Sequence, residues 1–283
     1  MTRRHLFPAL LGWAASARPA RQAVSLGGCA LLLDLRNGRL LVSEGAEVAR
    51  RLVAAPGSTL KPLSLLALLE ANKLALQEEY FCSRHLVLNG QRLDCSHPNI
   101  AAPMNVSRAI AYSCNCAVAH FARRFEIGEL ARYLLRSGIC SRTGLLPDSE
   151  ATGHIEPASA GPATQLQALG QSPAAVTPLG LLAAYRNLAL RVGRPLFAPI
   201  LDGLESAVEF GTARAAQLPR VSVAGKTGSV MSATGLHAAW FAGFAPSRFP
   251  EVAVLVLVQG RSGGADAAPI AASLLRTYFA SRP

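Results

Sequence analysis

The sequence feature that most constrains the fold is one long apolar segment early in the chain. Residues 56–76 end in LSLLALLEANKLAL, which places apolar side chains on nearly all sides of a predicted helix. A helix that is apolar all round has no face suited to water, so we expect it in the centre of the domain. Pro56 and Gly57 precede this predicted helix, and Ser58 lies at its start. The remaining elements are expected to pack around it.

Strand patterns occur at both ends of the chain. CALLLDLRNGRLLVSE predicts two strands joined by a turn at Asn37–Gly38, and VSVAGKTGS, LHAAWFAGFAP and EVAVLVLVQG predict three more, before a closing helix over about 266–280. Short connections favour antiparallel neighbours. We therefore predict an α+β fold with one antiparallel sheet built from both chain ends, covered by helices, and an all-helical lobe inserted from the middle.

The middle of the chain has mostly helical patterns. MNVSRAIAYSCNCAVAHFARRF, IGELARYLLRS and LGLLAAYRNLALR all repeat apolar residues at helical spacing. Residues 141–176 are rich in Gly, Pro, Ser and Ala, and we expect a loop there.

Composition excludes several classes of protein. The chain has 283 residues, half of them hydrophobic, which is enough for a large buried core. The net charge is +11, but the arginines are scattered and aromatic residues are few, so nucleic-acid binding is not expected. No segment reaches the roughly 20 apolar residues that a membrane span requires.

The N-terminus is typical of an export signal. Arg3 and Arg4 are followed by an apolar run over 6–15 and by Ala-Ser-Ala, a small-residue cleavage pattern. We predict that residues 1–17 are a cleaved export signal and that 18–283 form one catalytic domain outside the cytoplasm. An amphipathic N-terminal helix is the alternative. Attachment to a membrane is expected only if the signal stays uncleaved.

Six cysteines suit an oxidising compartment. Cys82 and Cys95 flank RHLVLNGQRLD, which predicts a hairpin turning at Asn89–Gly90. A disulfide between these two cysteines is our first interpretation. Free thiols are a second, and a metal site with His97 is a third, although its fourth ligand is not obvious. We expect Cys114 and Cys116 to be packing residues rather than redox groups.

Three short motifs follow one another in an order that suggests chemistry. The sequence has only three lysines, and two of them lie in these motifs, where an amine can act as a base and arginine cannot. The motifs are Ser58-Thr59-Leu60-Lys61, Ser113-Cys114-Asn115 and Lys226-Thr227-Gly228, the last followed by Ser229.

The first motif predicts a nucleophile beside its base. Residues three apart share one face of a helix, so Lys61 can lie next to the Ser58 hydroxyl. A serine hydroxyl needs such a base to become nucleophilic. Lysine acts as a base only when neutral, so its pKa must fall, and burial and a second cation, Lys226, would both lower it. The N–H groups of Ser58 and Ser229 can form an oxyanion hole.

The other two motifs suit the substrate. Ser113 can relay a proton to a leaving amine, and Asn115 can hold a substrate amide. Lys226 and Thr227 can bind a substrate carboxylate, and Gly228 lets a substrate backbone approach the strand.

These motifs resemble those of the penicillin-binding transpeptidases and serine β-lactamases. APGSTLKPL, AYSCNCAVAHFAR, GQSPAAVTPLGLLAAYRNLA, EFGTARAAQ, VAGKTGS and AAWFAGFAP all resemble segments of penicillin-binding proteins, over residues 24–280. The resemblance implies the fold and roles above. It also implies a D,D-transpeptidase or D,D-carboxypeptidase that acts on D-Ala-D-Ala peptides of peptidoglycan through an acyl-Ser58 intermediate and binds penicillin covalently.

The resemblance also implies the partners. We expect peptidoglycan stem peptides, β-lactam antibiotics and cell-wall assembly proteins, with no cofactor and no catalytic metal. The compact chain, without a long pedestal domain, leaves the acyl acceptor open between water and an amine. A serine β-lactamase is one alternative, although no class A deacylating glutamate segment is present. A penicillin-recognising sensor or scaffold without turnover is the other.

Overall fold

The structure is a computed structural model that describes residues 22–23, 27–159, 161–231 and 237–281. The predicted export signal, residues 1–17, lies outside the described residues. Within the described ranges, no helix combines the length and apolar character needed to cross a membrane.

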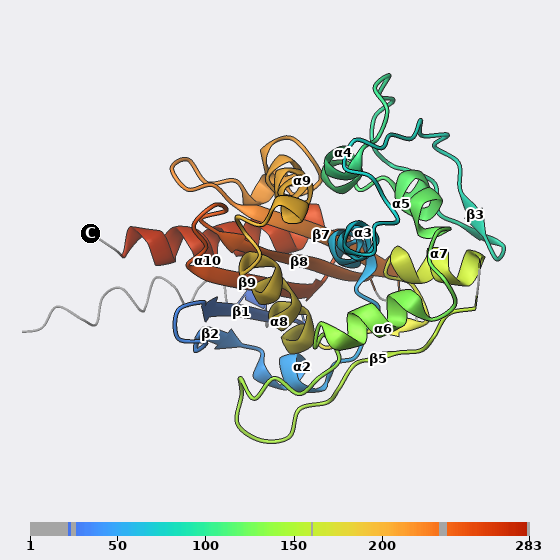
Figure 1. Cartoon of the computed structure of the whole chain (residues 1–283). Helices are drawn as coiled ribbons and strands as arrows, with labels where there is room; N and C mark the ends of the chain where they lie inside the picture. Colours follow the sequence, from blue (N-terminus) through green and yellow to red (C-terminus); the bar gives the residue numbers. More distant parts are fainter. Residues whose placement is uncertain (1–21, 24–26, 160, 232–236, 282–283) are drawn as a thin grey trace, which may run out of the picture.

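One five-stranded sheet joins the two ends of the chain (Figure 1). Its strands, in the spatial order β2-β1-β9-β8-β7, are Leu40–Glu44, Cys29–Asp34, Val252–Gln259, His237–Ala245 and Ala224–Met231. All neighbours are antiparallel, and the N-terminal strand β1 pairs with β9 from Cys29↔Leu257 to Asp34↔Val252. The sheet predicted from both chain ends is confirmed.

Both faces of this sheet are covered, and successive side chains of β9 enter different clusters. Val254, Val256 and Val258 pack with helix α10 (Ala268–Ala280), whereas Leu255 and Leu257 pack with the larger core that contains helix α8 (Pro178–Ala189). Alternation of side chains across a strand produces this division. It explains why β1 and β9 have continuous apolar sequences instead of alternating ones.

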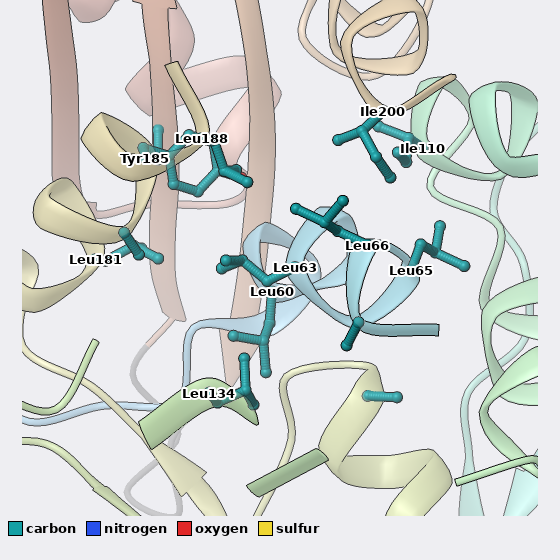
Figure 2. Close-up of a cluster of buried hydrophobic side chains, with 14 of the residues drawn as sticks. Leu60, Leu63, Leu65, Leu66, Ile110, Leu134, Leu181, Tyr185, Leu188 and Ile200 are labelled. Carbon is teal, nitrogen blue, oxygen red and sulfur yellow. The ribbon is translucent and has the colours of Figure 1, made fainter. Parts of the chain in front are cut away.

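Helix α3 (Lys61–Glu70) lies at the centre of the larger core, preceded by a 3₁₀ turn, η1 (Gly57–Leu60). Its residues from Lys61 to Leu69 are all buried. Figure 2 shows leucines of this segment facing side chains of several other elements, among them Ile110 of α4 (Val106–Ala111), Leu134 of α6 (Glu129–Arg136), Tyr185 of α8 and Ile200 of α9 (Ala198–Glu209). The predicted central helix is confirmed.

Helix α3 ends at Glu70, six residues before the predicted end. Asn72 has φ +55°, its N–H donates to Leu69 O, and the N–H of Lys73 donates to Leu68 O. This pair of bonds is the Schellman motif, which ends a helix at a left-handed residue, usually glycine and sometimes asparagine. The apolar run through Leu76 masked this stop signal in the sequence.

The inserted lobe contains two two-stranded sheets as well as helices, so it is not the all-helical lobe that the sequence predicts. The predicted hairpin forms with strands β3 and β4, and the segment 141–176, expected to be a loop, contains α7 and the two-stranded sheet of β5 and β6. The predicted helix over 104–125 breaks into α4 and α5. The further bounds are α2 Ala46–Arg51, β3 Val87–Leu88, β4 Gln91–Arg92, α5 Asn115–Ala122, β5 His154–Ile155, α7 Pro162–Ala168, β6 Ala174–Ala175, η2 Pro195–Phe197, η3 Arg214–Ala216 and η4 Gly263–Ala267.

The central position of α3 predicts a large cost for truncating it. Leu65 is fully buried, so Leu65→Ala should lower the free energy of unfolding by about 2–5 kcal/mol through lost burial and a residual cavity. Leu190, which is 57% exposed, provides the matched Leu→Ala control with a change near zero. Urea unfolding of both variants measures the difference. Equal midpoints would contradict the central packing of α3.

Candidate active site

The turn that carries Ser58 is fixed from several sides. In a 3₁₀ helix, residues i and i+3 are eclipsed, so η1 stacks the half-buried Ser58 over the buried Lys61. Gly57 has φ +55° and donates its N–H to Gly170 O at 2.9 Å. A Cβ on Gly170 would lie 1.9 Å from Gly57 O, so only glycine permits this approach.

Two hydroxyl groups support the same turn. Thr59 Oγ1 donates to Pro56 O at 2.7 Å, and the buried Tyr185 OH donates to Thr59 O at 2.8 Å. Both bonds satisfy buried carbonyl groups that would otherwise be costly. Sequence reasoning assigned no role to Thr59, Tyr185 or Gly170. Gly170 begins the GQSPAAVTPLG segment, and the resemblance of that segment to penicillin-binding proteins is the sequence signal that points to it.

The second motif lies at the break between α4 and α5. Ser113 has φ +54°, its N–H donates to Ile110 O, and the N–H of Cys114 donates to Ala109 O. This is again a Schellman arrangement, with serine where glycine is usual. Left-handed backbone costs a non-glycine residue roughly 1–2 kcal/mol. The strained turn directs the Ser113 side chain and carbonyl toward Lys61.

Lys61 connects the first and second motifs. Its fully buried Nζ donates to Ser113 O at 2.7 Å, to Ser113 Oγ at 3.1 Å and to Asn115 Oδ1 at 2.5 Å. Asn115 Nδ2 in turn donates to Leu93 O at 2.9 Å. Burial lowers the pKa of Lys61 to about 8, against the opposing effect of nearby cysteines.

The third motif lies on β7, the edge strand of the sheet beside η1. A Cβ on Gly228 would lie 2.6 Å from Pro56 O and 3.0 Å from Thr59 Cγ2, so this glycine allows the Ser58 turn to approach the strand. Ser229 is exposed, and its Oγ accepts the N–H of Gly263 at 3.0 Å.

Lys226 and Thr227 share a partner that sequence reasoning missed. Thr212 Oγ1 accepts from Lys226 Nζ at 3.4 Å and from Thr227 Oγ1 at 3.0 Å. Lys226 Nζ also donates to Thr227 O at 3.2 Å. Burial, followed by the positive charge of Lys61, holds the pKa of Lys226 well below its usual value. Thr212 belongs to the EFGTARAAQ segment, where no residue had been given a role.

The structure therefore brings parts of all three motifs together. Lys61 contacts Ser113 and Asn115, the Ser58 turn packs against Gly228, and the charge of Lys61 acts on Lys226. For Lys61 itself, burial lowers the pKa as the sequence suggested, whereas Lys226, suggested as a second cause, is not among the groups that shift it.

The expectations for the cysteines need correction. Cys82 and Cys95 are both free, with their Sγ atoms 3.7 Å apart, well beyond the ~2.05 Å of a disulfide bond. Cys114 is not a simple packing residue, because its Sγ lies 3.4 Å from Cys82 Sγ and 3.7 Å from Cys95 Sγ. Cys116 Sγ also lies 3.5 Å from Cys95 Sγ.

Comparison with known proteins agrees with this fold. The family model described as "Penicillin binding protein transpeptidase domain" matches residues 28–276. Stage V sporulation protein D of Bacillus subtilis is 27% identical over 268 residues, which cover 78% of this chain and 41% of that protein. Peptidoglycan D,D-transpeptidase PbpA of Mycobacterium tuberculosis is 25% identical over 274 residues, which cover 81% of this chain and 55% of that protein. The chain thus spans about half the length of these relatives.

Solved structures share the fold. PBP2 of Pseudomonas aeruginosa, crystallised with WCK 5153, aligns with a TM-score of 0.80 and 22% identity over 94% of this chain and 74% of that one. The TP domain of Burkholderia pseudomallei penicillin-binding protein 3 aligns with a TM-score of 0.81 and 20% identity, over 95% of this chain and 94% of that one. The fold and the motifs define the penicillin-recognising class of proteins. Within that class, the chain belongs to the penicillin-binding protein transpeptidase family.

The left-handed backbone of Ser113 makes a prediction about stability. Ser113→Gly and Ser113→Ala both remove the hydroxyl, but only glycine relieves the strain at φ +54°. We expect the glycine variant to be more stable than the alanine variant by about 1 kcal/mol. Denaturant unfolding of the pair measures this difference. An alanine variant equal or superior in stability would contradict the strain, because alanine is favoured over glycine at ordinary helical positions.

Proposed function

We propose that this protein is a serine D,D-transpeptidase that is acylated at Ser58 by D-Ala-D-Ala stem peptides of peptidoglycan and, in the same way, by β-lactams. The observation that carries the proposal is the position of Lys61. This buried amine lies one 3₁₀ turn from Ser58, bonds Ser113 and Asn115, and has a pKa lowered to about 8.

Acylation would move one proton from Ser58 through Lys61 and Ser113 to the leaving amine. Neutral Lys61 accepts the Ser58 hydroxyl proton as Oγ attacks the carbonyl carbon of the donor peptide bond. The N–H groups of Ser58 and Ser229 stabilise the oxyanion, a donor pair of the kind whose single loss typically costs ~2.7–4 kcal/mol. The proton then passes from Lys61 to Ser113 Oγ, 3.1 Å away, and to the leaving D-Ala amine.

Strand β7 would hold the donor peptide. An edge strand offers unpaired backbone groups to an extended peptide, and β7 has this position in the sheet. The terminal carboxylate of the substrate would bind the group formed by Lys226, Thr227 and Thr212, which already exchange hydrogen bonds. Asn115 would orient a substrate amide, and Gly228 would keep the strand close to the Ser58 turn.

An amine acceptor is favoured over water. The relative PbpA is named as a D,D-transpeptidase, which supports acyl transfer to a wall amine. For a class A β-lactamase, a free carboxylate would have to deacylate Ser58. Glu150 is buried and accepts bonds from the N–H of Thr143 at 2.5 Å and from Thr143 Oγ1 at 3.0 Å, so it serves its own loop.

The place of action follows from the substrate. Peptidoglycan lies outside the cytoplasm, so we propose that residues 1–17 direct export and that 18–283 act in the periplasm or cell envelope. Wall assembly proteins are the partners expected there.

The nucleophile is tested with a fluorescent penicillin. We expect covalent labelling of the wild type and of Ser273→Ala, a control serine on α10, and none of Ser58→Ala. Fluorescence of each protein band on a denaturing gel measures the covalent label. Labelling that persists in Ser58→Ala would remove Ser58 from the proposal.

The acceptor is tested by mass spectrometry of the products from a stem pentapeptide. With an added amine acceptor, we expect the crosslinked product in excess over the hydrolysed tetrapeptide. If the tetrapeptide is the sole product, the protein is a carboxypeptidase. Fast hydrolysis of nitrocefin would indicate a β-lactamase. Acylation by penicillin without any peptide product would indicate a sensor.

The lowered pKa of Lys61 predicts the pH dependence of acylation. Only the neutral amine accepts a proton, so the acylation rate should rise to a plateau above about pH 8 and fall about tenfold per pH unit well below it. Stopped-flow acylation with a chromogenic β-lactam over pH 5–9 measures the profile. Lys61→Arg keeps the charge but cannot be a base, so it should lose acylation by orders of magnitude. An acylation rate independent of pH, or normal acylation in Lys61→Arg, would refute the role of Lys61 as the base.

A further inference from the structure

Four side chains at the base of the β3–β4 hairpin converge on one point. Cys82, Cys95, His97 and Cys114 each direct one possible ligand atom there, and these four atoms lie within 4.8 Å of one another. Cys95, His97 and Cys114 are buried, and Cys82 is partly buried. The group therefore brings together the hairpin, the segment after it and the second motif of the active site.

The spacing of these atoms fits a tetrahedral metal ion. Zinc bonds of about 2.3 Å to sulfur and 2.0–2.1 Å to nitrogen place tetrahedral ligands roughly 3.8 Å apart for two sulfurs and roughly 3.6 Å apart for sulfur and nitrogen. The Sγ atoms of Cys82, Cys95 and Cys114 are separated by 3.4, 3.7 and 3.7 Å, and Cys82 Sγ lies 3.5 Å from His97 Nε2. These four distances are close to those expected between the ligands of a bound zinc ion.

Each sulfur also receives a backbone hydrogen bond. The N–H of Arg84 points to Cys82 Sγ at 3.3 Å, that of Cys116 to Cys95 Sγ at 3.4 Å, and that of Ala117 to Cys114 Sγ at 3.4 Å. Such donors stabilise thiolates, which are the form that binds a metal. Three converging thiolates without a cation would repel one another.

The histidine is oriented in the way a ligand requires. His97 Nδ1 lies 2.8 Å from Pro98 O, so it carries the ring proton and donates it to that carbonyl. The other nitrogen, Nε2, then has its lone pair directed toward the three sulfurs.

We propose that Cys82, Cys95, His97 and Cys114 bind one structural zinc ion. Three thiolates and one imidazole form a ligand set that favours zinc, and four protein ligands leave no position for substrate. Cys114 supplies the fourth ligand that the sequence did not reveal.

Cys116 lies beside this set without joining it. Its Sγ is 3.5 Å from Cys95 Sγ, but it also contacts Ser83 Oγ at 3.6 Å and His85 O at 3.7 Å. Cys116 is not one of the four residues whose ligand atoms all lie within 4.8 Å of one another, which makes it a matched control for Cys114.

The ion would act as a positioning group for the active site. Cys114 lies between Ser113 and Asn115, both of which bond Lys61, and Asn115 also bonds Leu93 O of the hairpin segment. A metal ion bound by Cys114, Cys82 and Cys95 together would hold the strained Ser113 turn against that hairpin. This consequence rests on the proposed function, whereas the metal site itself does not.

The test is metal analysis of the protein, purified without a histidine tag from zinc-supplemented medium. We expect one zinc per chain in the wild type, in Cys116→Ser and in Cys140→Ser, and about tenfold less in Cys114→Ser. Zinc retained by Cys114→Ser, or lost from Cys116→Ser, would overturn the ligand set. Zinc-free wild type with a Cys82–Cys95 disulfide, seen as a 2 Da lower intact mass, would overturn the site.

Cobalt substitution covers the case in which Cys114→Ser does not fold. Wild-type protein stripped of metal and titrated with Co²⁺ should show saturable sulfur-to-cobalt charge transfer and tetrahedral d–d bands at one equivalent. Absence of these bands would refute the site. Because penicillin labelling is not needed for either readout, failure of the metal site and failure of the acylation proposal are separable.

Discussion

Lys61 is buried in the centre of the protein, and the rest of the site depends on how its amine is satisfied. A buried ammonium group without partners would be too costly to keep charged. Its Nζ has three acceptors, Ser113 O, Ser113 Oγ and Asn115 Oδ1, and hydrogen bonds to charged groups contribute roughly 1.5–3 kcal/mol each. These contacts depend on three elements: the all-apolar helix α3, the Ser58 turn before it, and the break between α4 and α5.

Close backbone approaches make the arrangement compact. Gly170 lets the Gly57 carbonyl come near, and Gly228 lets β7 come near Pro56, so the Ser58 turn is held between the helical lobe and the sheet edge. β7 is an edge strand because it pairs with β8 on one side only, while β1 occupies the far side of β9.

The sequence predicted the sheet, the central helix and the order of the motifs, because apolar periodicity and turn residues are local signals. It did not predict the end of α3 at Glu70, because the apolar run continues past the left-handed Asn72 that ends the helix. Nor did it predict Thr212 and Tyr185 as neighbours of the motifs, or the contact of Cys114 with Cys82 and Cys95, because those contacts join segments that lie far apart in the chain. The prediction of a disulfide between Cys82 and Cys95 was wrong for the same reason. The two cysteines that flank the hairpin suggest a bridge, but the sequence does not show that Cys114 Sγ lies beside both of them.

The central claim is that Ser58 becomes acylated. Peptide mapping by mass spectrometry after brief exposure to benzylpenicillin, with an acid quench, tests it most directly. We predict that the peptide containing Ser58 gains the full mass of the antibiotic, because the β-lactam ring opens without a leaving group. An adduct on any other peptide, or an unmodified protein at saturating antibiotic, would contradict it.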